Sequence, residues 1–232
     1  SPHYPAWHNF ELCKELSNEL GLKVVLDNDA NMVAGGELWK GAGRGQKNFI
    51  MITLGTGIGG GIVMDGRIFH GDEGFAGEIG HQVIQFDGQR CDCGGHGCWE
   101  TIVSIDGLKR LVETSGDPRK DNFLKRFHGE VEKITPKLLF ELAGDGDIFA
   151  GVIWKKFGAY LGAGIASLVN VLGIHTVVIG GGISQAWDFF AGAAKKEIAK
   201  RTYKETAARV VLKRAELGDA AGIIGAANAV LF

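Results

Sequence analysis

The chain has 232 residues, of which 45% are hydrophobic and 22% are charged, and its formal net charge at pH 7 is -2. This length allows one large domain or two small ones, and the composition is that of a folded globular protein rather than a disordered or fibrous one. The sequence has no run of lysine or arginine that would attract a phosphate backbone, so we expect no nucleic-acid binding through these residues.

The amino-terminal segment has no basic region followed by an apolar run, which is how a secretory signal begins, so a cytoplasmic location is expected. Apolar side chains recur at helical spacing over residues 8–20, and Gly21 follows them, which predicts an amphipathic helix. KVVLDND, residues 23–29, predicts a buried strand, and ANMVAGGELWKGA, residues 30–42, predicts a helix.

Residues 48–71, NFIMITLGTGIGGGIVMDGRIFHG, predict two strands around a glycine-rich turn, with Asp65-Gly66 as a further hairpin turn. The chain becomes irregular beyond Gly74. Later helices are expected at about 99–112, 120–134, 136–143, 147–172, 184–200 and 218–232, and later strands at 175–180 and 208–215. Strands that alternate with helices predict an α/β layer with a largely buried sheet.

Residues 157–174 contain no formally charged side chain, and a segment of this length can cross a bilayer. Four glycines, Ser167 and Asn170 dilute its hydrophobicity, and a strand with a glycine turn follows closely. This pattern favours a buried helix that leads into a buried strand, so no membrane association is expected.

Three of the four cysteines fall within CDCGGHGCWE, residues 91–100. They are too closely spaced to pair comfortably with one another, and without a secretion signal a stable disulfide is not expected. A metal site is the favoured interpretation, and a redox-active or simply reduced cluster is the alternative. Three thiolates need a fourth ligand to close a tetrahedral zinc site, and His81 and His96 are the candidates.

Glycine is unusually frequent, with 37 residues, and two glycine clusters follow predicted strands: LGTGIGGG at 54–61 and IGGGIS at 179–184. Glycine lets the backbone approach a ligand closely, and a run of unhindered N–H groups can cradle phosphate. Neither cluster matches the Walker or the dinucleotide pattern, and a tight hairpin alone also explains the first. Two such turns that face one cleft would suit a split nucleotide site.

Asp29 lies at the end of the predicted strand, where its carboxylate could accept a proton from a substrate hydroxyl. The alternative is that Asp29 caps the following helix, because aspartate is a favoured N-cap residue. Glu78 and His81 in GEIGH, together with Glu100, could bind a polyhydroxylated ligand, although any one of them alone is more often a solvated surface group.

Taken together, these stretches resemble the ROK family of sugar kinases and repressors, which includes bacterial glucokinases, fructokinases and N-acetylhexosamine kinases. The resemblance implies an actin-like, ribonuclease H-like ATPase fold in which two lobes close on sugar and nucleotide. It is carried by NDAN at 28–31, GELWKGAG at 36–43, LGTGIGGGIV at 54–63, GEIGH at 77–81, CDCGGHGCWE at 91–100 and VVIGGGIS at 177–184.

The resemblance implies that Asp29 is the general base that takes the proton from the sugar hydroxyl as it attacks the γ-phosphate of ATP. It also implies that ATP binds with Mg²⁺ as the co-substrate. The residues that would hold the sugar hydroxyls are Asn28, Glu78, His81 and Glu100. The ligands of a structural zinc ion would be His81, Cys91, Cys93 and Cys98. The residues that would contact the nucleotide are Gly55, Thr56, Gly57, Gly59, Gly60, Gly180, Gly181 and Gly182.

The family's first lobe begins with an Asp-x-Gly-Gly-Thr phosphate and magnesium loop, which nothing in this sequence matches. We therefore interpret residues 1–232 as the larger carboxy-terminal lobe, with the amino-terminal lobe absent, a zinc-stapled loop at 74–100 and a helical insertion at about 99–145. The insertion is an expected homodimer surface. His3 stands where the family commonly has a sugar-contacting asparagine, which leaves the hexose open.

The expected function is ATP-dependent phosphorylation of a hexose, foremost glucose to glucose 6-phosphate, with N-acetylhexosamine or fructose as other substrates of the same class. The 232 residues alone are expected to be a poor kinase, because half of the nucleotide site would be missing. One alternative is the sugar-sensing domain of a repressor that reads DNA through an upstream domain. Another is a noncatalytic domain in which zinc only stabilises a loop.

Overall fold

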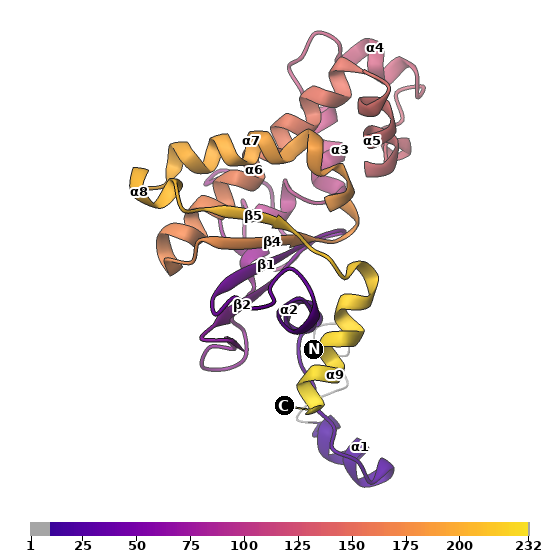
Figure 1. Cartoon of the computed structure of the whole chain (residues 1–232). Coiled ribbons are helices and arrows are strands. Elements are labelled where there is room, and N and C mark those ends of the chain that lie inside the picture. Colours follow the sequence, from indigo (N-terminus) through magenta and orange to yellow (C-terminus); the bar gives the residue numbers. More distant parts are fainter. Residues whose placement is uncertain (1–9, 232) are drawn as a thin grey trace.

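A computed structural model of the chain describes residues 10–231, so His3 lies outside the described residues. The fold is α/β, as predicted, with a five-stranded sheet between two layers of helices (Figure 1). The strand order is β3-β2-β1-β4-β5. The strands are β1 (Phe49–Leu54), β2 (Ile58–Met64), β3 (Arg67–Ile68), β4 (Thr176–Gly180) and β5 (Val211–Arg214).

Strand pairing brings the two glycine turns together. Strands β1 and β2 form an antiparallel hairpin in which Leu54 pairs with Ile58, so residues 55–57 make the turn. Strand β4 runs parallel to β1, with Gly180 opposite Thr53. Because the carboxyl ends of parallel neighbours lie at the same edge of a sheet, the turn after β1 and the turn after β4 are adjacent.

One face of the sheet is covered by α6 (Ile148–Leu172) and α7 (Trp187–Arg201), with α3 (Ile105–Glu113) and α5 (Pro136–Gly144) beyond them (Figure 1). Alternate residues of β1, among them Ile52, point into this main core because strand side chains alternate between faces. Helix α6 contains the uncharged segment, and it is buried against the sheet and α7. Within residues 10–231, no helix is both long and apolar enough to span a membrane.

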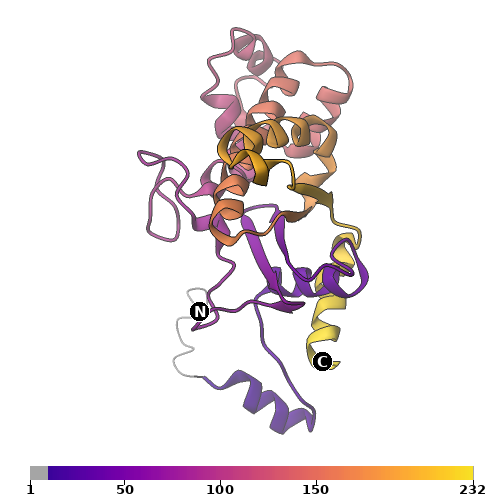
Figure 2. The same ribbon diagram turned by 60° about the vertical axis from the view of Figure 1, so that its left-hand side comes forward.

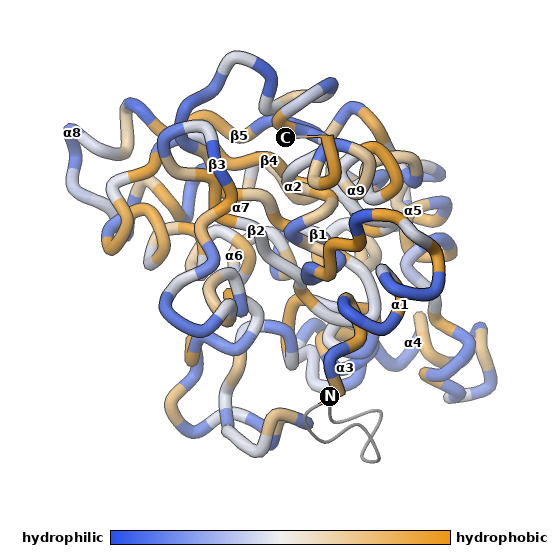
Figure 3. Tube along the Cα trace, turned by 90° about the horizontal axis from the view of Figure 1, so that it is seen from below, coloured by the Kyte–Doolittle hydropathy of each residue, from blue (hydrophilic) through white to orange (hydrophobic). Residues whose placement is uncertain are grey.

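The opposite face carries α2 (Asp29–Lys40), and α9 (Ala221–Leu231) packs against that helix. Phe49 and Met51 of β1 point to this side, into a smaller core with Ala34 of α2. Viewed from below, α2 and α9 lie side by side (Figure 3). Helix α1 (Leu12–Leu20) projects away from the sheet and its helices, and none of its side chains is buried (Figures 1 and 2).

The prediction of a strand at residues 23–29 is wrong. Residues 23–28 have no regular secondary structure, because no described strand lies beside them to accept a ladder of hydrogen bonds. Val25 and Leu26, which the pattern assigned to a buried strand, are exposed.

Two predicted helices are interrupted. The helix expected at 120–134 ends as α4 (Lys120–Lys125), since His128 and Gly129 adopt positive φ values of 56° and 79° that do not continue a helix. The helix expected at 99–112 is a short 3-10 turn followed by α3. Ser104 separates the two by capping α3, where its Oγ accepts the N–H of Gly107 at 3.1 Å.

The other predicted elements are present with shifted ends. Helix α6 starts after the capping side chain of Asp147 and ends at Gly173, which has a φ of 66°. The first helix ends at Gly21 as predicted. The short elements are the 3-10 turns Ile79–His81, Trp99–Thr101, Val131–Lys133, Gly182–Ala186 and Gly218–Ala220 and the helix α8 (Lys204–Ala207).

Candidate functional site

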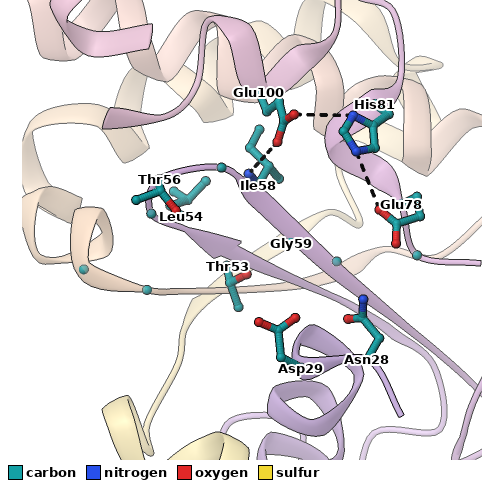
Figure 4. Close-up of a pocket in the computed structure, with 16 residues that line it drawn as sticks. Asn28, Asp29, Thr53, Leu54, Thr56, Ile58, Gly59, Glu78, His81 and Glu100 are labelled. Carbon is teal, nitrogen blue, oxygen red and sulfur yellow. Dashed lines mark hydrogen bonds and ion pairs between the residues drawn. The ribbon is translucent and has the colours of Figure 1, made fainter. Parts of the chain in front are cut away.

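A cavity of about 380 Å³ lies at the adjacent carboxyl ends of β1 and β4 (Figure 4). It gathers nearly all the residues to which the sequence assigned sugar or nucleotide contacts. Gly180 is the exception, because it is buried within β4 between Met51 and Ala215. The lining residues are Asn28, Asp29, Thr53, Leu54, Gly55, Thr56, Gly57, Ile58, Gly59, Gly60, Gly77, Glu78, His81, Glu100, Gly181 and Gly182.

The start of α2 presents Asn28 and Asp29 to the cavity. Asn28 is the N-cap, and its Oδ1 accepts the N–H of Ala30 at 2.8 Å, so the alternative that Asp29 caps the helix is wrong. Asp29 is the first residue of the helix, where the partial positive charge of the helix end favours a carboxylate. Its side chain is exposed and points toward Thr53 (Figure 4).

Asp27 fixes the segment that precedes these two residues. Its carboxylate accepts the N–H of Asn28 at 2.7 Å, the Nδ2 of Asn31 at 2.8 Å, and lies 2.7 Å from the Nε2 of His70. Burial raises the pKa of Asp27, but the hydrogen bonds from His70 and Asn31 outweigh it and hold the pKa below its ordinary value. His70 follows β3, so this contact joins the segment before α2 to the segment after β3.

Several glycines at the cavity are required by protein packing rather than by a ligand. A Cβ on Gly60 would lie 2.4 Å from the carbonyl oxygen of Gly77, and Gly181, at a φ of 83°, would place one 2.4 Å from the carbonyl oxygen of Leu54. By contrast, a Cβ on Gly55 or Gly182 would meet no atom within 4 Å. The prediction that glycine lets backbone approach a ligand therefore applies best to these last two positions.

Glu100 links the hairpin turn to the opposite wall. Its Oε2 accepts the N–H of Ile58 at 3.4 Å, and its Oε1 lies 3.4 Å from the Nδ1 of His81. The other ring nitrogen of His81 is 3.8 Å from the carboxylate of Glu78 (Figure 4). These three side chains thus form one polar wall of the cavity, opposite Asp29.

Cys91, Cys93, Cys98 and His81 form a second cluster that shares His81 with the cavity. Their ligand atoms all lie within 4.8 Å of one another. The Sγ of Cys91 is 3.7 Å from the Nδ1 of His81, and the sulfurs of Cys93 and Cys98 are 3.6 Å apart. Ligand atoms around a tetrahedral zinc ion are about 3.5–3.8 Å apart, so this donor set fits the metal.

His96, the other candidate for the fourth ligand, is exposed and is not part of this cluster. The backbone between the cysteines folds tightly, with the N–H of Cys91 donating to Gly95 at 2.8 Å. Burial raises the pKa of Cys91 to about 12 and also raises that of Cys98, whereas a backbone N–H at Gly95 lowers the pKa of Cys93.

Sequence reasoning missed one polar residue of the cavity and an adjoining pocket. Thr53 lies at the end of β1 beside Asp29 (Figure 4), and its position directly before the glycine cluster was the available signal. A second, mainly apolar cavity of about 330 Å³ adjoins the first. It shares Gly55 and Gly182 with the first cavity, and its walls include Ile105, Phe140, Trp154 and Ile183.

The chain is similar to bacterial glucokinases and, at lower identity, to a repressor. A glucokinase of Halalkalibacterium halodurans is 42% identical over 220 residues, which are 94% of this chain and 67% of that protein. The crystal structure of a ROK family glucokinase from Streptomyces griseus, in complex with glucose and AMPPNP, is 32% identical with a TM-score of 0.80, and the match covers 97% of this chain and 73% of the other. A xylose repressor of Bacillus subtilis is 27% identical over 97% of this chain and 55% of its own length.

The model of the ROK family matches residues 1–231, which is nearly the whole chain. This match agrees with the α/β fold and with the motifs from which the resemblance was drawn. The chain belongs to the ROK family.

Proposed function

We propose that this protein is a sugar kinase that phosphorylates a hexose with ATP, foremost glucose to glucose 6-phosphate. The observation that carries the proposal is the placement of Asp29, whose exposed carboxylate shares one cavity with the glycine turns and with the polar wall of Glu78, His81 and Glu100. The similarity to glucokinases at 35–42% identity supports it.

In the proposed reaction, a sugar hydroxyl oxygen attacks the γ-phosphorus of ATP. A new oxygen–phosphorus bond forms, the bond from that phosphorus to the bridging oxygen breaks, ADP leaves, and the hydroxyl proton passes to the carboxylate of Asp29. Mg²⁺, bound with ATP, would offset the negative charge of the phosphates. Phosphoryl transfer depends mainly on positioning and charge stabilisation, so the residues that orient the sugar and the phosphates would supply most of the catalysis.

The remaining polar residues would position the sugar. The amide nitrogen of Asn28 is free to donate because its oxygen is used by the helix cap, and Glu78 and Glu100 can accept from sugar hydroxyls. Zinc, when bound by His81 through Nδ1 and by the three cysteines, would stabilise the loop at 74–100. That would leave the Nε2 of His81 for the sugar.

The nucleotide would lie on the two glycine turns. Gly55 and Gly182 stand between the polar cavity and the apolar cavity, so phosphates in the first and an adenine ring in the second would fit a single bound ATP. This placement supports a nucleotide, rather than a purely anionic chain of phosphates, as the phosphate donor.

The chain spans 67% of the glucokinase it matches, and we propose that it forms the larger lobe of a two-lobed enzyme. The second candidate function is sugar sensing in a repressor, which the 27% identity to a xylose repressor supports. The presence of a carboxylate at Asp29, placed to accept a proton, favours the kinase.

An ADP-release assay on the full-length gene product distinguishes the two functions. With ATP and glucose, mannose, fructose, N-acetylglucosamine or N-acetylmannosamine in turn, the kinase proposal expects turnover with at least one sugar, foremost glucose. Calorimetric binding of a sugar without ADP release would overturn the kinase proposal and support the sensor.

A further inference from the structure

A separate polar cavity of about 230 Å³ lies between the loop at 74–100 and helices α3 and α6. Two cationic side chains line it: Arg110 from the last turn of α3 and Lys156 from α6. The described residues that line it include no aspartate or glutamate. The other polar side chains that line it are those of Gln85, Gln89, Thr101, Thr114 and Tyr160.

The two cations have no acidic partner. Both are half-buried, and neither forms an ion pair within residues 10–231, whereas the neighbouring Lys109 contacts both Asp106 at 3.3 Å and Glu132 at 2.5 Å. Arg110 is held in place because its Nη1 donates to the carbonyl oxygen of Thr101 at 2.8 Å. Partly desolvated cations that share a cavity without a carboxylate favour a bound anion.

We propose that this cavity binds a phosphate group, either as inorganic phosphate or as a phosphate monoester. The guanidinium fork of Arg110 and the ammonium of Lys156 supply charged donors, and the amides of Gln85 and Gln89 and the hydroxyl of Tyr160 supply neutral ones. This cavity shares no lining residue with the cavity of Asp29, so the inference does not depend on the proposed kinase activity.

The site is connected to the polar wall of the first cavity. Arg110 contacts the carbonyl of Thr101, whose hydroxyl donates to the carbonyl of Cys98 at 2.7 Å, and Glu100 lies between these two residues. An anion that changes the position of Arg110 would therefore act on the segment that carries Glu100. Sugar binding and phosphate binding are expected to change each other's affinity by the same factor.

The test is calorimetric titration of the full-length gene product, in low-salt buffer, with inorganic phosphate and separately with glucose 6-phosphate. Wild type is expected to bind at least one of them saturably, and the probe whose binding Lys156→Gln weakens more identifies the source of the phosphate group. Arg110→Gln and Lys156→Gln should each weaken that binding by about tenfold or more, because each removes a charged donor.

Lys155→Gln is the matched control, since Lys155 is exposed on the same helix and does not line the cavity. Lys156→Gln keeps the test valid if Arg110→Gln disturbs the Thr101 segment, which a lowered Tm would reveal. If glucose 6-phosphate binds only in the sugar cavity, its affinity should be the same for Lys156→Gln as for wild type. The proposal is overturned if wild type binds neither probe, or if Lys156→Gln and Lys155→Gln bind both as tightly as wild type.

Discussion

Asp27 connects the segment that precedes Asp29 to the segment that follows β3. It does so through short contacts with Asn31 and with His70, whose ring lies 2.7 Å from the carboxylate. The carboxylate side chain is only 13% exposed, which makes these contacts stronger than those of a surface ion pair. The segment that carries Asp29, the proposed base, is thus held in place by the hydrogen bonds of the Asp27 carboxylate.

Asp27→Asn is expected to destabilise the protein by about 1–3 kcal/mol at pH 7, because hydrogen bonds to a charged group are lost. The pKa of Asp27 is lowered by folding, so its contribution is present above the unfolded pKa of about 3.9 and is lost as the pH falls through the folded pKa. Urea unfolding from pH 7 to pH 3 should show the difference between wild type and variant shrinking below about pH 4.

Asp72→Asn, at an exposed position outside the helices and strands, serves as the control and should leave stability unchanged at every pH. An Asp27→Asn difference that stays constant down to pH 3 would show that the charge of Asp27 is not what stabilises the fold.

Among the elements, α6 and α7 pack with little space between their backbones. A Cβ on Gly162 would lie 2.4 Å from the carbonyl oxygen of Ala194, and one on Gly158 would lie 2.3 Å from that of Phe190. The small residues of the uncharged segment therefore allow close helix packing. This is the structural reason for a composition that, from sequence, also suggested a membrane segment.

Gly162→Ala should lower the free energy of unfolding by about 1–3 kcal/mol through overpacking against α7. Gly151→Ala in the same helix is the matched control, because its Cβ would enter open space and should stabilise by about 0.5–1 kcal/mol. Thermal unfolding measures both. Equal effects of the two substitutions would contradict the packing described for α6 and α7.

The sequence predicts best those elements that are determined by residues close by in the chain. The β1–β2 hairpin and the end of α6 at Gly173 are determined by nearby residues, and both are confirmed. The strand predicted at 23–29 needed a partner strand that the apolar pattern cannot reveal. The break at His128 depends on a backbone conformation that glycine favours and histidine does not.

The same distinction holds for the candidate site. The motifs predicted that Asp29 and His81 lie in one site, and both line the cavity. Spacing alone could not choose His81 over His96 as the neighbour of the cysteines, since that choice depends on how the loop folds back. The apolar cavity that adjoins Gly55 could not be predicted either, because it combines α3, α5 and α6 with the turn after β4.

At the scale of the whole molecule, the loop at 74–100 projects from the sheet as an irregular segment of the chain (Figure 2). Its ordered backbone depends on few regular hydrogen bonds, among them isolated bridges between Val83 and Cys98 and between Arg90 and His96. A bound zinc ion would add stability where secondary structure supplies little, and it would hold His81 at the cavity.

Cys93→Ser should therefore reduce zinc content below the expected one ion per chain, lower the Tm and raise the KM for the hexose. Cys13→Ser, on the projecting helix α1, is the control and should change none of the three. Metal analysis, thermal unfolding and ADP release give the three readouts. Unchanged zinc stoichiometry in Cys93→Ser would exclude the ligand set proposed here.

The central claim, that Asp29 is the base of a phosphoryl transfer, is tested most directly by Asp29→Asn in the full-length gene product, with Asp106→Asn as an exposed-acid control. Loss of the base should lower kcat for glucose phosphorylation by about 10²–10⁴-fold, while calorimetry shows glucose binding nearly unchanged. An Asp29→Asn variant that releases ADP as fast as wild type would contradict the proposed mechanism.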